Sequence, residues 1–251
     1  MKSYGPTGSR RVASHDDETN YLESVGDIMS GLLFVFILTM AVFAILFQQQ
    51  RDVLAETTRA QQQAVAELTQ IDDMRRQLLE GLAQSLKERG IQIQIDLEQG
   101  VLRLPESILF PSGRAELTPT GKRAVGILAE ELTRVLPCFS ASPPKQCDPV
   151  TAGKLEVVLI EGHTDDVPIH NAPFPDNWSL SAARSITTYR ELIRAAPALS
   201  ELRNRRGVPL FGVAGYADQR PVADNKTEAG KQLNRRIDIR FVMAMPAPRT
   251  R

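Results

Sequence analysis

One uncharged apolar run constrains the N-terminal part of this 251-residue sequence more than any other feature. The run covers residues 28–47, and Asp27 immediately precedes it. About twenty apolar residues form a helix about 30 Å long, which matches the hydrocarbon core of a bilayer. The sequence therefore predicts a single transmembrane helix over residues 25–47. A carboxylate at its edge either faces a partner or a water-filled path, or lies in the polar interface outside the lipid.

The residues before this run favour an uncleaved anchor over a signal peptide. The run is too long for a signal peptide, and it follows an acidic segment at Asp16, Asp17 and Glu18 rather than a short basic one. Lys and Arg residues on the two sides of the run give only a slight positive-inside bias. The 30 basic and 30 acidic residues balance, so no global attraction to nucleic acid follows.

The two cysteines, Cys138 and Cys147, enclose a short Pro-containing loop and are the only cysteines in the sequence. In an oxidising compartment they would form a disulfide that closes this loop. The alternative is a pair of free, unrelated thiols.

Residues 48–90 are predicted to form a helical connector. They contain no proline before Arg89, and their apolar residues follow the alternating three-four spacing of a helix with a narrow apolar seam. The seam consists of Ala64, Leu68, Ile71, Leu78 and Leu82, with Leu79 and Leu86 beside it. Because Arg75 interrupts the seam, we expect either weak pairing with a second copy or a solitary solvated helix, and not a sustained coiled coil.

Residues 91–243 are predicted to form a soluble α+β domain, an α/β sandwich with one mixed sheet and one layer of helices. Strands are expected at residues 91–97, 101–104, 155–160, 211–216 and 236–243. Helices are expected at residues 118–136 and 179–195. Residues 244–251 are expected to be a disordered tail.

Five sequence blocks in this region resemble, in order, the motifs of OmpA-like peptidoglycan-binding domains. The blocks are residues 108–117 (ILFPSGRAEL), 161–165 (EGHTD), 177–184 (NWSLSAAR), 215–217 (GYA) and 234–237 (NRRI). The insert at residues 166–178 is similar to the MotB branch of these domains.

The resemblance implies a pocket for the stem peptide of peptidoglycan, whose diaminopimelate residue presents an ammonium and a carboxylate. By resemblance, Asp165 would take the ammonium and Arg184 the carboxylate, since a guanidinium can bind a carboxylate through two hydrogen bonds. The remaining predicted site residues, which would line or brace the pocket or set its loop, are Thr164, Asn177, Leu180 and Arg236. The alternative is an ordinary surface salt bridge between Asp165 and Arg184.

Other chemistry is not indicated. Glu161, His163, Asp165 and Asp166 are metal-ligand types, but their spacing matches no recognised zinc motif. We therefore expect no metal and no other cofactor, and His163 is interpreted as a loop-shaping residue. Trp178 is expected to pack in the interior at a helix start rather than to stack on a sugar. The sequence shows no nucleophile elbow or phosphate loop, so it does not indicate an enzyme.

An anchor followed by such a domain resembles the B subunit of ion-driven stators, the MotB class. The resemblance implies that Asp27 carries protons or sodium ions beside a multi-helix MotA-type or ZorA-type partner, and that a second copy of the chain is present. It also implies an inner-membrane protein with residues 1–24 cytoplasmic and the C-terminal domain periplasmic, bound to peptidoglycan.

The block around Asp27 resembles ZorB-type subunits of Zorya anti-phage defence more than it resembles flagellar members. Flagellar members usually place an aromatic-Ala pair before the carboxylate, whereas Val25 and Gly26 stand here, and the N-terminal tail is acidic. This resemblance implies a role in defence. A flagellar stator subunit and a passive peptidoglycan tether remain as alternatives.

Overall fold

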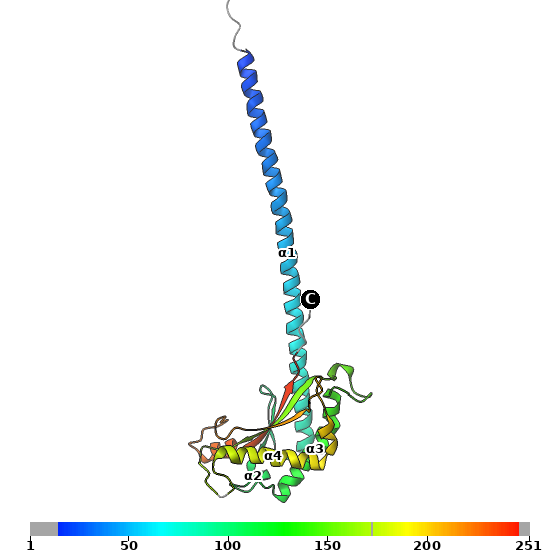
Figure 1. Cartoon of the computed structure of the whole chain (residues 1–251), viewed down its shortest axis with the longest axis vertical. Coiled ribbons are helices and arrows are strands. Elements are labelled where there is room, and N and C mark those ends of the chain that lie inside the picture. The colour runs from blue at the N-terminus through cyan, green and yellow to red at the C-terminus, as the bar shows by residue number, and fades with distance from the viewer. Residues whose placement is uncertain (1–14, 172, 246–251) are drawn as a thin grey trace, which may run out of the picture. The chain divides into compact units, whose positions relative to one another are not determined.

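The computed structural model describes residues 15–171 and 173–245, with the side chains of the N-terminal helix described from Ser24 onward. Residues 1–14 of the predicted cytoplasmic tail and residues 246–251 of the predicted C-terminal tail therefore lie outside the described residues. The chain divides into two compact units, residues 1–63 and 64–251, and helix α1 (His15–Glu88) contributes to both. Each unit is described separately below (Figure 1).

The first unit contains the apolar part of α1. Among the described residues, α1 is the one helix long and apolar enough to span a membrane, by length and composition. The large apolar side chains between Ile28 and Phe47 are all exposed within the chain itself. Ser30 and Thr39 donate their hydroxyl hydrogens to the carbonyls of Asp27 and Phe36 in the same helix. Asp27 therefore stands immediately before an apolar stretch whose large side chains are exposed among the described residues.

The second unit is built on one mixed five-stranded sheet. Its strands are β1 (Gln94–Asp96), β2 (Val101–Pro105), β3 (Leu155–His163), β4 (Phe211–Gly215) and β5 (Arg236–Met243). Their spatial order is β1-β2-β5-β3-β4; β3 and β4 are parallel and the other neighbours are antiparallel. With the long apolar helix before it, this arrangement confirms the predicted α+β fold class with one mixed sheet.

Helices cover one face of this sheet. The helical segments after α1 are α2 (Glu106–Leu109), α3 (Pro119–Val135), α4 (Asn177–Ala195) and α5 (Glu228–Asn234), with short 3-10 turns η1 (Leu136–Phe139), η2 (Pro149–Thr151) and η3 (Pro197–Glu201). In Figure 1, α3 and α4 lie side by side and contact each other. Helix α4 also contacts β3 and β4. The helices begin where local capping predicts, because the side chains of Thr118 and Asp176 accept backbone N–H bonds at the starts of α3 and α4.

The register separates an apolar face from a charged face. Leu102 on β2 lies opposite Ile239 on β5, which lies opposite Ile160 on β3, and all three side chains are buried under the helices. The neighbouring cross-strand row is charged and consists of Arg103, Asp238 and Glu161. Because successive side chains of a strand point to opposite faces, the charged row lies on the face away from the apolar core.

Several boundaries differ from the sequence prediction. The first strand is limited to Gln94–Asp96, because Ile91 and Ile93 pack against the core at the sheet edge without strand pairing. Strand β3 continues three residues beyond the predicted end at Ile160, through the block EGH. Helix α5 was not predicted because it is only two turns long and its buried residues are Gly230 and Asn234, so it shows no apolar period.

The end of α1 belongs to the core of the domain. Leu78, Leu79, Leu82 and Leu86 are buried in the same cluster as the apolar face of the sheet. Arg75 donates hydrogen bonds to the carbonyls at residues 97 and 98, in the turn between β1 and β2. This part of the seam is therefore neither solvated nor left for a second copy, which corrects both alternatives considered for it.

Replacing Leu79 should destabilise the domain. Leu79 is fully buried, so Leu79→Ala should lower the free energy of unfolding by about 2–5 kcal/mol. The matched control is Leu68→Ala in the same helix, where the leucine is 44% exposed and the change should be small. Pulse proteolysis of the full chain in detergent across a urea series measures both, and equal urea midpoints for the two variants would contradict the assignment.

Candidate functional site

A cavity of about 270 Å³ opens where the end of β3 meets the start of α4. Five of the six predicted pocket-site residues, all except Arg236, line this cavity: Thr164, Asp165, Asn177, Leu180 and Arg184. Glu106, Arg235 and the loop at residues 112–113 complete its polar and backbone lining. The sequence blocks that are far apart in the chain therefore meet at one place.

Two glycines allow α4 to approach the sheet closely enough for this meeting. Gly162 on β3 and Gly215 on β4 are cross-strand partners. A Cβ atom at Gly162 would lie 2.1 Å from the carbonyl oxygen of Ser181, and one at Gly215 would lie 2.6 Å from the backbone nitrogen of Ala182. Neither position has room for a side chain, so the glycines of the EGHTD and GYA blocks fix where α4 lies on the sheet.

Asn177 holds the loop that follows Asp165. Its side-chain oxygen accepts a hydrogen bond from the backbone N–H of Ile169 (3.2 Å). Its side-chain nitrogen donates to the carbonyls of Asp165 (3.3 Å) and Val167 (3.0 Å). Asn177 therefore shapes the pocket loop, and Thr164 does the same from the strand side, where its backbone N–H donates to the carbonyl of Ala217.

Arg184 is a buried cation held by several acceptors. Its side chain is only 2% exposed, its Nε donates to the carbonyl of Arg114 (2.8 Å), and its Nη2 is paired with Glu106. The guanidinium also lies over the ring of Phe110, 5.2 Å from the ring centre. Burial lowers the pKa of Arg184, and the adjacent Glu106 carboxylate acts in the opposite direction.

Asp165 and Arg184 do not form a direct ion pair with each other. The Asp165 carboxylate pairs with Arg235 at 2.5 Å and accepts the backbone N–H of Val167 at 3.2 Å. Arg235 also contacts Glu106 (3.1 Å) and Glu228 (3.0 Å). Burial lowers the pKa of Arg235, but its hydrogen bonds to Asp165 and Glu228 outweigh burial, and the net direction is upward. The simple Asp165–Arg184 surface salt bridge is therefore not what the structure contains.

The structure places Arg236 outside the pocket, which corrects its predicted position. Its Nε donates to both carboxylate oxygens of Asp238 (3.1 and 3.0 Å), and its Nη atoms donate to the carbonyls of Asn234 and Arg220. The cause is strand parity: on β5, Arg236 points to the same face as Asp238 and Arg240. Arg235, one residue earlier, enters the pocket instead.

Sequence reasoning missed Glu106 and Arg235 as pocket residues. The alternation of Arg236, Asp238 and Arg240 with apolar residues on β5 could have assigned Arg236 to the charged face and left Arg235 for the pocket. No comparable signal marks Glu106, which enters the pocket because α2 is a single turn between β2 and the loop that follows.

Trp178 is 52% exposed, so the expectation of an interior packing role is wrong. The buried stripe of α4 includes Leu180, Ser181, Arg184 and Ser185. At 100° per residue, Trp178 lies at the edge of that stripe in the first turn of the helix, where no other element covers it.

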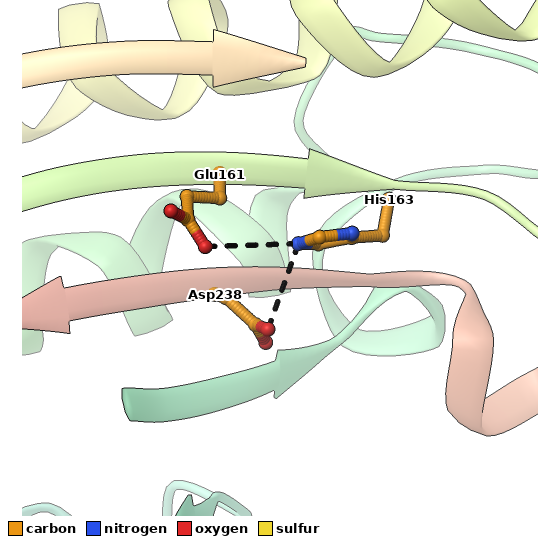
Figure 2. A group of neighbouring side chains, drawn as sticks. All are labelled: Glu161, His163 and Asp238. Atoms are coloured by element: carbon orange, nitrogen blue, oxygen red, sulfur yellow. Dashed lines mark ion pairs between the residues drawn. The ribbon is translucent and has the colours of Figure 1, made fainter. Parts of the chain in front are cut away.

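On the opposite face of the sheet, Glu161, His163 and Asp238 form a buried cluster of metal-ligand types (Figure 2). The Nε2 atom of His163 lies 3.9 Å from Glu161 and 3.6 Å from Asp238. The carboxylates are already held by arginines, because Arg240 donates to both oxygens of Glu161 (2.9 Å each) and Arg236 to both oxygens of Asp238. A metal ion would have to displace these guanidiniums, so the cluster works as an ion-pair network that joins three strands.

His163 is the neutral member of this network and lies in the strand, not in a loop, which corrects its interpretation as loop-shaping. Burial lowers the pKa of His163 to about 3, and the nearby guanidiniums of Arg236, Arg220, Arg240 and Arg103 act in the same direction. Burial also raises the pKa of Asp238, against the opposing effect of Arg236 and Arg103. The ring of His163 stacks on Tyr216 with centres 5.4 Å apart, and the guanidinium of Arg220 also lies over the Tyr216 ring, 3.7 Å from its centre.

The loop between α3 and β3 carries the two cysteines. In the structure Cys138 and Cys147 are bonded, with Cα atoms 5.3 Å apart. Thr151 donates its hydroxyl hydrogen to the carbonyl of Cys138, which fixes the returning segment to the same loop.

No family model matches the chain. Motility protein B of Bacillus subtilis is 26% identical over 174 residues, which are 69% of this chain and 57% of that protein. The uncharacterised B. subtilis protein YtxE is 30% identical over 172 residues, 67% of this chain and 60% of that protein. The chain thus spans about 60% of the length of these relatives.

Among solved structures, a MotB-like protein from Desulfovibrio vulgaris aligns with 74% of this chain and 99% of its own, at 24% identity and a TM-score of 0.49. In sequence, the chain is similar to motility protein B.

The neutral state of His163 should make stability depend on pH. Below its ordinary pKa of 6.5, the unfolded chain binds a proton at His163 that the folded chain does not bind until the pH approaches 3. Wild type should therefore lose up to about 1.4 kcal/mol of stability per pH unit as the pH falls below 6.5, relative to His163→Gln. Urea unfolding of both proteins at pH 7.5 and 5.5 measures this difference. Parallel pH dependence of the two would show that His163 titrates normally in the folded chain.

Proposed function

We propose that this chain is the wall-anchored subunit of an ion-driven stator-type complex in a bacterial inner membrane. The observation that carries the proposal is that one chain combines a membrane-length helix, with a single carboxylate at its start, and a pocket that brings Asp165 and Arg184 together. Similarity to motility protein B supports the same function. The chain would have its N-terminus in the cytoplasm and its domain in the periplasm.

The pocket would bind the stem peptide of peptidoglycan. A diaminopimelate head group carries an ammonium and a carboxylate on one carbon, and the cavity offers both a carboxylate and guanidiniums. Arg184 cannot rotate freely because Glu106 and two backbone carbonyls hold it, so its remaining N–H groups are already oriented. Such preorganisation lowers the entropy lost when a ligand binds.

Asp27 would bind and release the transported ion. It opens a stretch, residues 28–50, that contains no charged side chain, so no group in its own helix can neutralise it within that stretch. A single helix supplies only one wall of an ion path, and a multi-helix partner subunit would supply the others. Each elementary charge that crosses about 100 mV yields roughly 2.3 kcal/mol, so mechanical work would require repeated transfers.

We further propose that the complex acts in anti-phage defence, as ZorB-type subunits do with ZorA-type partners. The residues around Asp27 and the acidic N-terminal segment support this finer assignment. The similarity to motility protein B favours the second candidate, a flagellar stator subunit. The two differ in their readout, since one protects cells against phage and the other restores swimming.

Replacing either of the two predicted ligand-binding side chains of the pocket should weaken wall binding. Asp165→Asn removes the ammonium acceptor, and Arg184→Lys keeps the charge but loses the planar guanidinium. Both should weaken binding to isolated peptidoglycan sacculi at least about tenfold, the size expected for one charge-assisted hydrogen bond. Sedimentation of the full chain in detergent with sacculi measures the bound fraction.

The control for this experiment is Arg134→Lys on α3, whose side chain is 66% exposed and lies outside the pocket lining. It should bind as wild type does. Wild-type binding by both pocket variants would refute the assignment of the pocket.

Neutralising Asp27 should stop ion-driven function and leave the protein in the membrane. Cells that carry the complete operon with Asp27→Asn should lose protection against phage, measured as plaquing efficiency. The control is Asp52→Asn, an exposed carboxylate of the same helix beyond the apolar stretch, which should protect as wild type does.

If Asp27→Asn protects fully at normal protein level, the chain is a passive tether. If wild type protects against no phage of a broad panel but restores swimming to a strain without stators, the flagellar function holds instead.

A further inference from the structure

The pocket contains a continuous row of ion pairs formed by four side chains whose charges sum to zero. Asp165 pairs with Arg235, Arg235 pairs with Glu106, and Glu106 pairs with Arg184. Two carboxylates and two guanidiniums therefore alternate around the cavity that they line. Only Asp165 and Arg184 are needed to describe a site for an ammonium and a carboxylate, so the second pair calls for its own explanation.

Glu106 is the central member of this chain of charges. Its side chain is 8% exposed, and its two carboxylate oxygens contact different guanidiniums, Oε1 that of Arg184 and Oε2 that of Arg235. Its backbone N–H donates to the carbonyl of Arg235 (3.0 Å), which fixes α2 against the start of β5. Glu106 thus offsets positive charge from both arginines at once.

The contact with Glu106 also decides which part of Arg184 a ligand can reach. Nε and Nη2 of Arg184 are occupied by Arg114, Pro111 and Glu106. Nη1 has no hydrogen-bond partner among the described residues. It is also not one of the fully buried side-chain atoms that lack a partner, so it is not sealed off from the cavity. Nη1 is therefore the end of the guanidinium that remains for a carboxylate in the cavity.

We propose that Glu106 is a specificity-determining residue, which keeps the pocket neutral so that it prefers a head group with both an ammonium and a carboxylate over a simple carboxylate. This inference rests on the proposed wall-binding function. Without Glu106, two guanidiniums would face one carboxylate, and the excess positive charge would attract any carboxylate. With Glu106 in place, a ligand that lacks the ammonium makes no ion pair with Asp165. No favourable contact then offsets the free energy lost when the pocket is desolvated.

The test compares two probes on the full chain in detergent. One is a soluble stem tripeptide that ends in diaminopimelate with its free amine, and the other is the same peptide with that amine acetylated. Wild type should bind the free-amine probe at least about tenfold more tightly, and Glu106→Gln should reduce this preference to about threefold or less by binding the acetylated probe better. Isothermal titration calorimetry gives both dissociation constants.

The matched control is Glu131→Gln on α3, a buried glutamate that also pairs with two arginines, Arg89 and Arg134, outside the pocket lining. It should keep the wild-type preference. An unchanged preference in Glu106→Gln overturns the inference, whereas a wild type that binds neither probe overturns the proposed wall-binding function itself.

A second variant keeps the inference testable if Glu106→Gln does not fold. Arg235→Gln removes the more exposed guanidinium and leaves the pocket with a net negative charge. Its preference for the free-amine probe should rise above that of wild type, because the ammonium then offsets more negative charge. A preference that falls or stays equal overturns the role of charge balance.

Discussion

The close approach of helix α4 to strands β3 and β4 is the constraint on which the site depends. It is possible only because Gly162 and Gly215 are paired across the two strands and leave room for the backbone of α4. The hydroxyl of Ser185 then bonds the carbonyl of Ala214, which joins the helix to the sheet. Because α4 lies this close to the sheet, Arg184 reaches the loop before α3. Asn177, two turns earlier in the same helix, holds the loop after β3. A side chain at either glycine would separate the two halves of the pocket.

The two faces of the sheet solve different physical problems. One face buries apolar side chains under the helices and the end of α1, which supplies the hydrophobic stabilisation of the domain. The other face buries a row of charges that pair across strands: Arg103 and Arg236 with Asp238, and Arg240 with Glu161. Buried ion pairs add little net stability, because desolvation offsets their attraction, but a shift of strand register would leave them unpaired. The charged face therefore favours one register.

Helix α1 links the chemistry proposed for the membrane to that proposed for the wall through continuous backbone. The large apolar side chains of its membrane-length part are exposed among the described residues, whereas its last turns are part of the domain core. Arg75 contacts the turn between β1 and β2, where Gly100 has a positive φ of 69° and no room for a side chain beside that arginine. The predicted connector thus has a second role as a core element.

The sequence by itself predicted the apolar helix and the order of the main strands and helices, and its resemblance to OmpA-like domains implied five residues that line the cavity. The helices and strands follow from local rules, since apolar periodicity and caps are properties of short segments. Only the tertiary structure decided that Arg235 and not Arg236 enters the pocket, that Glu106 joins it, that His163 is buried among arginines, and that Leu79 and Leu86 pack in cis. Those outcomes depend on strand parity, on which face of a helix meets the core, and on contacts between residues up to 129 positions apart, as between Glu106 and Arg235. Periodicity within a short segment cannot specify them, because each requires the positions of two or more segments at once.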